Sequence, residues 1–96
     1  MRPSQALKQH RSEVLNVIAR YQLSNPRIFG SVARGEDRED SDIDILVDYD
    51  SPISTFKLAE LELALEAILN TRVDVRLPSE LSIAANETAS RDMRPI

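Results

Sequence analysis

Two aspartates separated by a single residue carry the strongest chemical signal in the sequence. Asp42 and Asp44 alternate with the apolar residues Ile43, Ile45 and Val47, which is typical of a β-strand. Because successive side chains of a strand point to opposite faces, the two carboxylates share one face and the apolar residues share the other. Neighbouring like charges repel unless a cation neutralises them. The spacing therefore predicts a divalent metal bound by Asp42 and Asp44.

A glycine and a serine upstream of these aspartates suit the binding of phosphate. Gly30 ends a short predicted strand, Arg27 to Gly30, and Ser31 follows it at the start of a predicted helical turn. Glycine lets the backbone approach a phosphate closely, Ser31 offers a hydroxyl and a backbone N–H, and the amino end of a helical turn favours an anion. Arg34 adds positive charge nearby. These residues predict a phosphate-binding turn beside the metal.

A third carboxylate, Asp74, stands on another predicted strand, Thr71 to Leu77. Its alternation buries Val73 and Val75 and turns Asp74 and Arg76 to the opposite face. If this strand pairs with the strand from Asp42 to Asp48, the three aspartates converge. Nucleotidyl transfer uses two metals ~3.5–4 Å apart held by hard carboxylates, and a further carboxylate can help to deprotonate the attacking hydroxyl. We therefore expect all three aspartates to be catalytic and metal-binding.

Two helices and a small mixed sheet are predicted to carry these residues. An amphipathic helix opens at Pro3 and Ser4 and ends at Ser24-Asn25-Pro26. A second helix begins at an N-cap, Ser54 or Thr55, and stops at Asn70, with its glutamates on the solvent side. The expected fold is α/β (α+β), with three or slightly more strands, the helices packed on one face and the acidic site on the other.

The remaining segments are predicted from their polarity. The charged run Glu36 to Asp40 contains no apolar residue, which indicates a solvated loop. The segment Ser79 to Met93 has helix formers but a thin apolar side, and predicts a weak helix. We expect one domain over residues 1–96, in which residues 79–96 are weakly ordered.

Composition restricts the kind of metal and partner. The 96 residues contain no cysteine and one histidine, His10, so oxygen ligands and magnesium are favoured over thiolates and zinc. A net charge of -4 argues against a broad nucleic-acid interface and favours a protein or a nucleotide. No apolar run approaches the ~20 residues of a membrane span, and the first residues do not form a signal peptide. A cytoplasmic protein is expected.

The compound pattern resembles the signature of the DNA polymerase β-like nucleotidyltransferase superfamily. Gly30-Ser31 is followed by ten residues, Val32 to Ser41, and then by Asp42-x-Asp44. The tight form Gly-Ser-x-Ala-Arg-Gly with Ser-Asp-x-Asp, in so short a chain, is similar to the minimal nucleotidyltransferases. The resemblance covers roughly Ile28 to Leu77, and Asp74 falls where the family carries its third acidic residue.

The resemblance implies a specific activity and partner. Minimal nucleotidyltransferases are commonly antitoxins whose toxins are helical HEPN ribonucleases, and characterised members transfer AMP from ATP to a tyrosine hydroxyl of the toxin. The resemblance therefore implies ATP as substrate, two Mg²⁺ ions held by the three aspartates, and a HEPN-family toxin as partner. It also implies that Gly30 and Ser31 grip the triphosphate, and we expect Arg34 and Ser41 to bind the nucleotide with them.

Two other functions stay open on the sequence alone. The chain could neutralise a partner by binding alone, or transfer a nucleotide to a small molecule or an RNA end, as larger relatives do. Those relatives close the site with a helical domain for which 96 residues leave no room. We therefore expect a partner to supply the missing wall and the acceptor.

Overall fold

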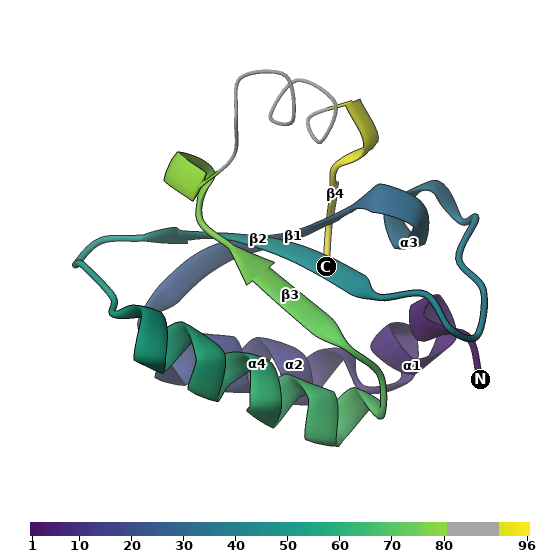
Figure 1. Cartoon of the computed structure of the whole chain (residues 1–96), viewed down its shortest axis with the longest axis horizontal. Coiled ribbons are helices and arrows are strands. Elements are labelled where there is room, and N and C mark those ends of the chain that lie inside the picture. The colour runs from purple at the N-terminus through teal and green to yellow at the C-terminus, as the bar shows by residue number, and fades with distance from the viewer. Residues whose placement is uncertain (81–90) are drawn as a thin grey trace.

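A four-stranded mixed sheet organises the structure, which is a computed structural model that describes residues 1–80 and 91–96 (Figure 1). The strand order is β3-β2-β1-β4, with β1 antiparallel to both β2 and β4, and β2 parallel to β3. The strands are β1 (Leu23–Phe29), β2 (Ile43–Tyr49), β3 (Val73–Arg76) and β4 (Arg94–Pro95). The predicted small mixed sheet is confirmed.

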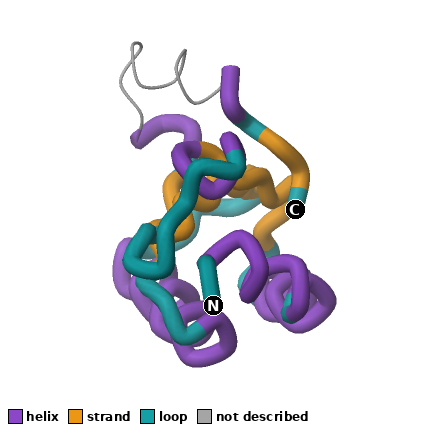
Figure 2. Tube along the Cα trace, turned by 90° about the vertical axis from the view of Figure 1, so that its right-hand side faces the viewer, coloured by secondary structure: helices purple, strands orange, loops and turns teal. Residues whose placement is uncertain are grey.

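The long helices cover one face of this sheet. They are α1 (Pro3–Gln9), α2 (Arg11–Arg20) and α4 (Thr55–Leu69), whereas the short α3 (Gly30–Arg34) follows the end of β1. Figure 2 shows the strands above the long helices. The core between the layers combines apolar residues of α2, α4 and β2, among them Val14, Ile18, Leu61, Leu65, Ile43, Ile45 and Val47. The predicted arrangement, with helices on one face, is confirmed.

Helix α4 begins and ends where its capping residues predict. The Ser54 hydroxyl accepts a hydrogen bond of 3.1 Å from the backbone N–H of Lys57, which satisfies an otherwise free donor of the first turn. Asn70 adopts a left-handed conformation, with φ 54°, and ends the helix. The buried face of α4 consists of Leu58, Leu61, Leu65 and Leu69.

The amino-terminal helix is not continuous, so the prediction of one helix was wrong. His10, with φ -108° and ψ 22°, separates α1 from α2, and α2 ends at Arg20. Leu7 and Val14 are both buried, so apolar spacing alone hides the break. Strand β1 accordingly starts at Leu23, earlier than predicted, and its register with β2 shifts between Ser24 and Arg27, around Pro26.

Strand β3 is shorter than predicted and lies at one edge of the described sheet. Two glutamates of α4 cover that edge: Glu66 accepts from the backbone N–H of Val73 at 3.0 Å, and Glu62 accepts from Val75 at 2.8 Å. The prediction that these glutamates simply face solvent was wrong. They satisfy backbone donors that an edge strand would otherwise leave free, and they tie β3 to α4.

The charged loop between α3 and β2 contains one buried acid, so the prediction of a fully solvated loop was wrong at Asp37. This side chain is 4% exposed and accepts a hydrogen bond of 2.9 Å from the backbone N–H of Ser4, in the first turn of α1. Burial by itself would raise the pKa of Asp37, but the hydrogen bonds from Ser4 outweigh it and the pKa is lowered. The carboxylate therefore anchors the loop to the start of a helix.

The carboxyl-terminal residues return to the sheet. A single 3₁₀ turn, Pro78–Glu80, follows β3, and the predicted helix Ser79 to Met93 falls largely on residues 81–90, outside the described residues. Arg94–Pro95 then forms β4 against β1, a strand that the sequence did not predict. Within residues 1–80 and 91–96, none of the helices has the length and apolarity needed to span a bilayer.

Candidate active site

The start of β2 places two aspartates on the sheet face that the long helices leave open. Ile43 and Ile45 are fully buried in the core, whereas Asp42 and Asp44 are half-buried on the other side. The predicted separation of apolar and acidic residues is thereby confirmed. Leu46 shares the face of Asp44 and is also buried, at 2% exposed. This face is therefore covered at Leu46, although the long helices lie on the other side of the sheet.

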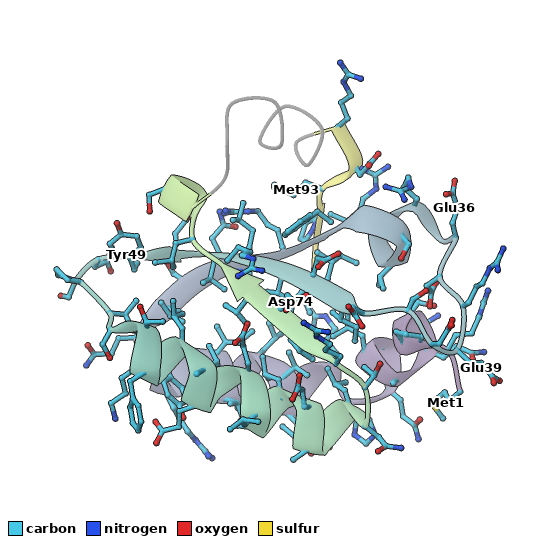
Figure 3. All side chains as sticks on the ribbon, viewed as in Figure 1. Met1, Glu36, Glu39, Tyr49, Asp74 and Met93 are labelled. Carbon is cyan, nitrogen blue, oxygen red and sulfur yellow. The ribbon has the colours of Figure 1, made fainter. Side chains whose placement is uncertain are left out.

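Parallel pairing of β2 with β3 brings in the third aspartate. Asp44 stands directly opposite Asp74 in the register, between the pairs Ile43 with Val73 and Ile45 with Val75. Adjacent strands lie about 4.8 Å apart, so two side chains on the same face are neighbours. Figure 3 shows Asp74 on β3. The expected pairing of these two strands is confirmed.

The pKa of Asp44 responds to the two carboxylates beside it. Burial, then the negative charges of Asp74 and Asp42, raise the pKa of Asp44, and the charge of Arg76 opposes them. Arg72 gives Asp42 a loose partner, with its Nε atom 3.9 Å from Asp42 Oδ2. Asp44 thus carries its negative charge against the preference of its surroundings. A group in that condition gains from a neighbouring cation.

Gly30 lies tightly against Asp44. Its backbone has φ 74°, in the left-handed region, and a Cβ atom there would stand 2.7 Å from Asp44 Oδ2. This proximity follows from the register, since Phe29 pairs with Asp44 at the end of β1. Ser31, half-buried, follows at the start of α3. The turn predicted to bind phosphate is therefore next to the aspartates predicted to bind metal.

Two other predicted nucleotide contacts already have partners in the structure. The guanidinium of Arg34 donates to Asp92 at 2.9 Å and to Glu36 at 3.2 Å, which raises its pKa. The Ser41 hydroxyl accepts a hydrogen bond of 2.8 Å from the backbone N–H of Arg38 and closes the turn before Asp42. Contact of either residue with a nucleotide stays a prediction.

The donor set suits a hard cation, although no compact cage is preformed. Asp42, Asp44 and Asp74 offer carboxylate oxygens, which are the ligands that Mg²⁺ prefers. Within the described part of the chain, no three acidic or histidine side chains are gathered closely enough to form a ready metal site. The residues fit a magnesium ion in kind and in neighbourhood, and a cation would draw their oxygens together.

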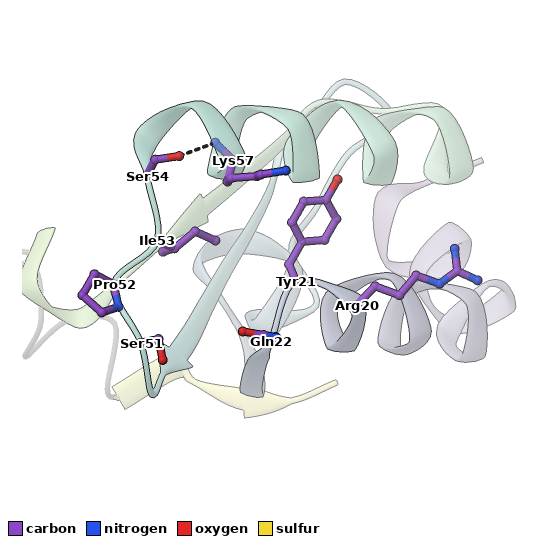
Figure 4. Close-up of a pocket in the computed structure, with 8 residues that line it drawn as sticks. All are labelled: Arg20, Tyr21, Gln22, Ser51, Pro52, Ile53, Ser54 and Lys57. Atoms are coloured by element: carbon purple, nitrogen blue, oxygen red, sulfur yellow. Dashed lines mark hydrogen bonds between the residues drawn. The ribbon is translucent and has the colours of Figure 1, made fainter.

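A cavity of about 440 Å³ lies elsewhere in the molecule, between the end of α2 and the start of α4 (Figure 4). Its lining residues are Arg20, Tyr21, Gln22, Ser51, Pro52, Ile53, Ser54 and Lys57. This cavity adjoins the carboxyl end of β2, whereas Asp42 and Asp44 lie at the amino end. It does not include any of the predicted site residues.

One charged residue of the open face received no role from the sequence. Arg76 follows Asp74 by two positions on β3, so both side chains lie on the same face. It is exposed and close enough to Asp44 to lower the pKa of that carboxyl. The alternation of β3 already placed Arg76 with Asp74, and only the pairing with β2 shows that it stands beside the site.

Aligned aspartates beside a glycine turn, on one face of a mixed sheet, are typical of α/β enzymes that act on phosphate groups. Comparison with known families agrees: the model of the nucleotidyltransferase domain matches residues 12–94, and the chain belongs to this family. The chain is therefore a nucleotidyltransferase. This confirms the family that the glycine, serine and aspartate motif predicted.

Two known proteins are similar to this chain over most of its length. The chain is 40% identical over 87 residues to protein adenylyltransferase MntA of Thermococcus cleftensis, which covers 91% of this chain and 85% of the relative. It is also 40% identical to a solved structure provisionally assigned as a minimal nucleotidyltransferase, with a TM-score of 0.84, covering 97% of this chain and 95% of the other. Sequence and fold therefore agree along nearly the whole chain.

More distant structures share the fold. A toxin–antitoxin crystal structure with AMP-PNP matches with a TM-score of 0.78 and 21% identity, covering 88% of this chain and 69% of the matched chain. A complex of a tri-AMPylated Shewanella oneidensis HEPN toxin with its MNT antitoxin matches with a TM-score of 0.72 and 18% identity, covering 92% and 69%. At these identities the likeness establishes the fold alone.

Proposed function

We propose that this nucleotidyltransferase transfers AMP from ATP to a tyrosine hydroxyl of a HEPN-family toxin and so acts as its antitoxin. The relative named protein adenylyltransferase MntA supports a protein acceptor, and the complex of a HEPN toxin with an MNT antitoxin supports the class of partner. The observation that carries the proposal is the register of Asp44 with Asp74, beside Gly30. Since HEPN toxins are ribonucleases, the pair would meet in the cytoplasm.

Each residue of the site has a role in this reaction. The acceptor oxygen attacks the α-phosphorus of ATP, the bond from that phosphorus to the bridging oxygen breaks, and pyrophosphate leaves with the electron pair. Asp74 accepts the proton of the attacking hydroxyl. Gly30 and Ser31 hold the departing phosphates through backbone and hydroxyl groups. Asp42, Asp44 and Asp74 would hold Mg²⁺, which neutralises charge on the triphosphate.

The test uses a HEPN-family toxin as acceptor. The double variant Asp42→Ala and Asp44→Ala is incubated with that protein, ATP and magnesium, and the mass of the acceptor is measured. The unchanged chain should add AMP, and the double variant or a chelator should abolish the transfer. Asp40→Ala, in the exposed loop just before β2, is the matched control and should keep the activity.

Three outcomes separate the alternatives. Transfer by the double variant at the normal rate would refute the assigned residues. A toxin that is inhibited yet unmodified by the unchanged chain would show neutralisation by binding alone. Modification of RNA ends or small molecules, with the toxin left unmodified, would replace the proposed acceptor. Circular dichroism of both variants checks that a lost activity is not a lost fold.

A further inference from the structure

Arg76 is an exposed cation beside the site. It stands opposite Leu46 in the register of β2 and β3. On the face that carries Asp44 and Asp74, Leu46 and Arg76 are the next pair along the two strands. Its side chain is exposed, and it makes no hydrogen bond or ion pair with the side chains of residues 1–79 and 91–96. Arg34, by contrast, is engaged by Asp92 and Glu36. Of these two arginines, Arg34 is held by acidic side chains, and Arg76 is exposed without such a partner among the described side chains.

The register places Arg76 across the aspartates from the glycine turn. Gly30 follows Phe29, which pairs with Asp44, so the turn lies beside the first residue of β2 and next to β1. Arg76 lies three positions further along, on β3. With ~3.3 Å per residue and ~4.8 Å between strands, the two backbones are about 14 Å apart, with Asp44 and Asp74 between them.

This placement assigns the two sides of the site to different substrates. If the turn at Gly30 and Ser31 holds the departing phosphates, the attacking oxygen approaches the α-phosphorus from the opposite side, because the displacement is in line. That side is the one on which Arg76 stands. A guanidinium there would meet the acceptor rather than the leaving group.

We propose that Arg76 contacts the acceptor, holds its aromatic hydroxyl beside Asp74 and stabilises the negative charge that the oxygen gains as its proton leaves. The proposal rests on the proposed function and adds the residue that recognises the acceptor. A planar guanidinium can lie against an aromatic ring and also donate to the phenolic oxygen, which favours tyrosine over an aliphatic hydroxyl. The bonds made and broken are those given above, and the proton goes to Asp74.

The test separates acceptor recognition from nucleotide binding. Arg76→Gln, Arg76→Lys and the control Arg20→Gln, an exposed arginine at the end of α2, are compared for kcat and KM toward the toxin and for affinity toward AMP-PNP with magnesium. Arg76→Gln should lower kcat/KM toward the toxin about 10- to 100-fold, the effect of losing one charge-assisted hydrogen bond. Its affinity for AMP-PNP should stay unchanged, Arg76→Lys should recover part of the rate, and Arg20→Gln should behave as the unchanged chain.

Several results would overturn the proposal. Normal transfer by Arg76→Gln would refute it and leave the proposed function intact. An equal loss of AMP-PNP affinity would assign Arg76 to the nucleotide instead. Failure of the unchanged chain to modify any acceptor would refute the proposed function, and the role of Arg76 with it. Thermal unfolding of the three variants shows that each is folded.

Discussion

Asp44 occupies a position in which its charge opposes folding, and the proposed function gives that charge a role. Burial and the charges of Asp74 and Asp42 raise the pKa of its carboxyl. Its ionised form is therefore less favourable in the folded chain than in the unfolded chain. By the same linkage, its contribution to stability is fully present below the unfolded pKa and is lost as pH rises through the folded pKa. At neutral pH, Asp44 lowers the free energy of unfolding.

Asp44→Asn should therefore stabilise the fold at neutral pH in the absence of a divalent cation, by a few tenths to about 1 kcal/mol. The gain should vanish at acidic pH, where Asp44 is protonated, and AMP transfer should be lost. Urea unfolding across pH measures this. Asp48→Asn is the matched control, because hydrogen bonds from Arg27 and Asn25 lower the pKa of Asp48 and its loss should destabilise. A destabilised Asp44→Asn would contradict the argument.

The two glycines of the chain allow the effect of backbone strain to be measured separately from the effect of close packing against Asp44. Gly30 and Gly35 have φ values of 74° and 72°, but only at Gly30 would a Cβ atom meet Asp44. Each substitution by alanine should lose about 1–2 kcal/mol from the left-handed backbone. Gly30→Ala should in addition displace Asp44 and abolish AMP transfer, whereas Gly35→Ala should keep it. Equal activity of both variants, measured beside thermal unfolding, would show that close packing at Gly30 is dispensable.

At the scale of elements, α4 holds β3 in place by side chains as well as by its apolar face. Glu62 and Glu66 accept hydrogen bonds from alternate backbone N–H groups of β3, and Leu61 and Leu65 pack in the core beneath the sheet. Because Asp74 lies on β3 between the two bonded valines, these glutamates also define where the third carboxylate stands. The helix thus restrains the strand segment that carries Asp74.

Glu62→Ala should leave the backbone N–H of Val75 without its acceptor and lower the free energy of unfolding by about 1–3 kcal/mol. It should also slow AMP transfer, because Asp74 loses a neighbouring restraint. Glu62→Gln keeps an acceptor oxygen at the same reach and should stay close to the unchanged chain in both measurements. Denaturant unfolding and the transfer rate are compared for the two variants. A Gln variant as weak as the Ala variant would mean that charge, not the hydrogen bond, is what matters.

At the scale of the whole molecule, the layers separate stability from chemistry. The apolar core lies between the sheet and the long helices, and the aspartates with Arg76 lie on the opposite face. Among the residues that the structure describes, that division keeps the long helices away from the acidic side of the sheet, where the proposed function places the substrates. It also explains why the site tolerates like charges, since the core on the other face stabilises the strands that carry them.

Contacts between residues far apart in the sequence hold the carboxyl-terminal residues against the rest of the molecule. Asp92 reaches Arg34 across 58 positions of sequence, and β4 extends the sheet beside β1. The backbone carbonyl of Ile96 accepts from the Arg11 side chain at 3.0 Å. The carboxyl-terminal residues therefore pack against both α2 and the strand that leads into the glycine turn.

The sequence alone determined whatever depends on neighbours along the chain. The alternation in β2 and β3 assigned Asp42, Asp44 and Asp74 to one face, since the side-chain period of a strand is local. Ser54 and Asn70 marked the ends of α4, because capping involves residues three or four positions apart. The spacing from Gly30 to Asp44 identified the family.

Only the tertiary structure decided the features that join separate segments. Four of these features left no periodic signal in the sequence. They are the break at His10, the burial of Asp37 under α1, the hydrogen bonds to Glu62 and Glu66, and the strand Arg94–Pro95. The same holds for the register that sets Asp44 opposite Asp74 and Arg76 beside them. These contacts depend on how the elements pack, and packing is governed by the whole set of buried surfaces rather than by any one stretch of sequence.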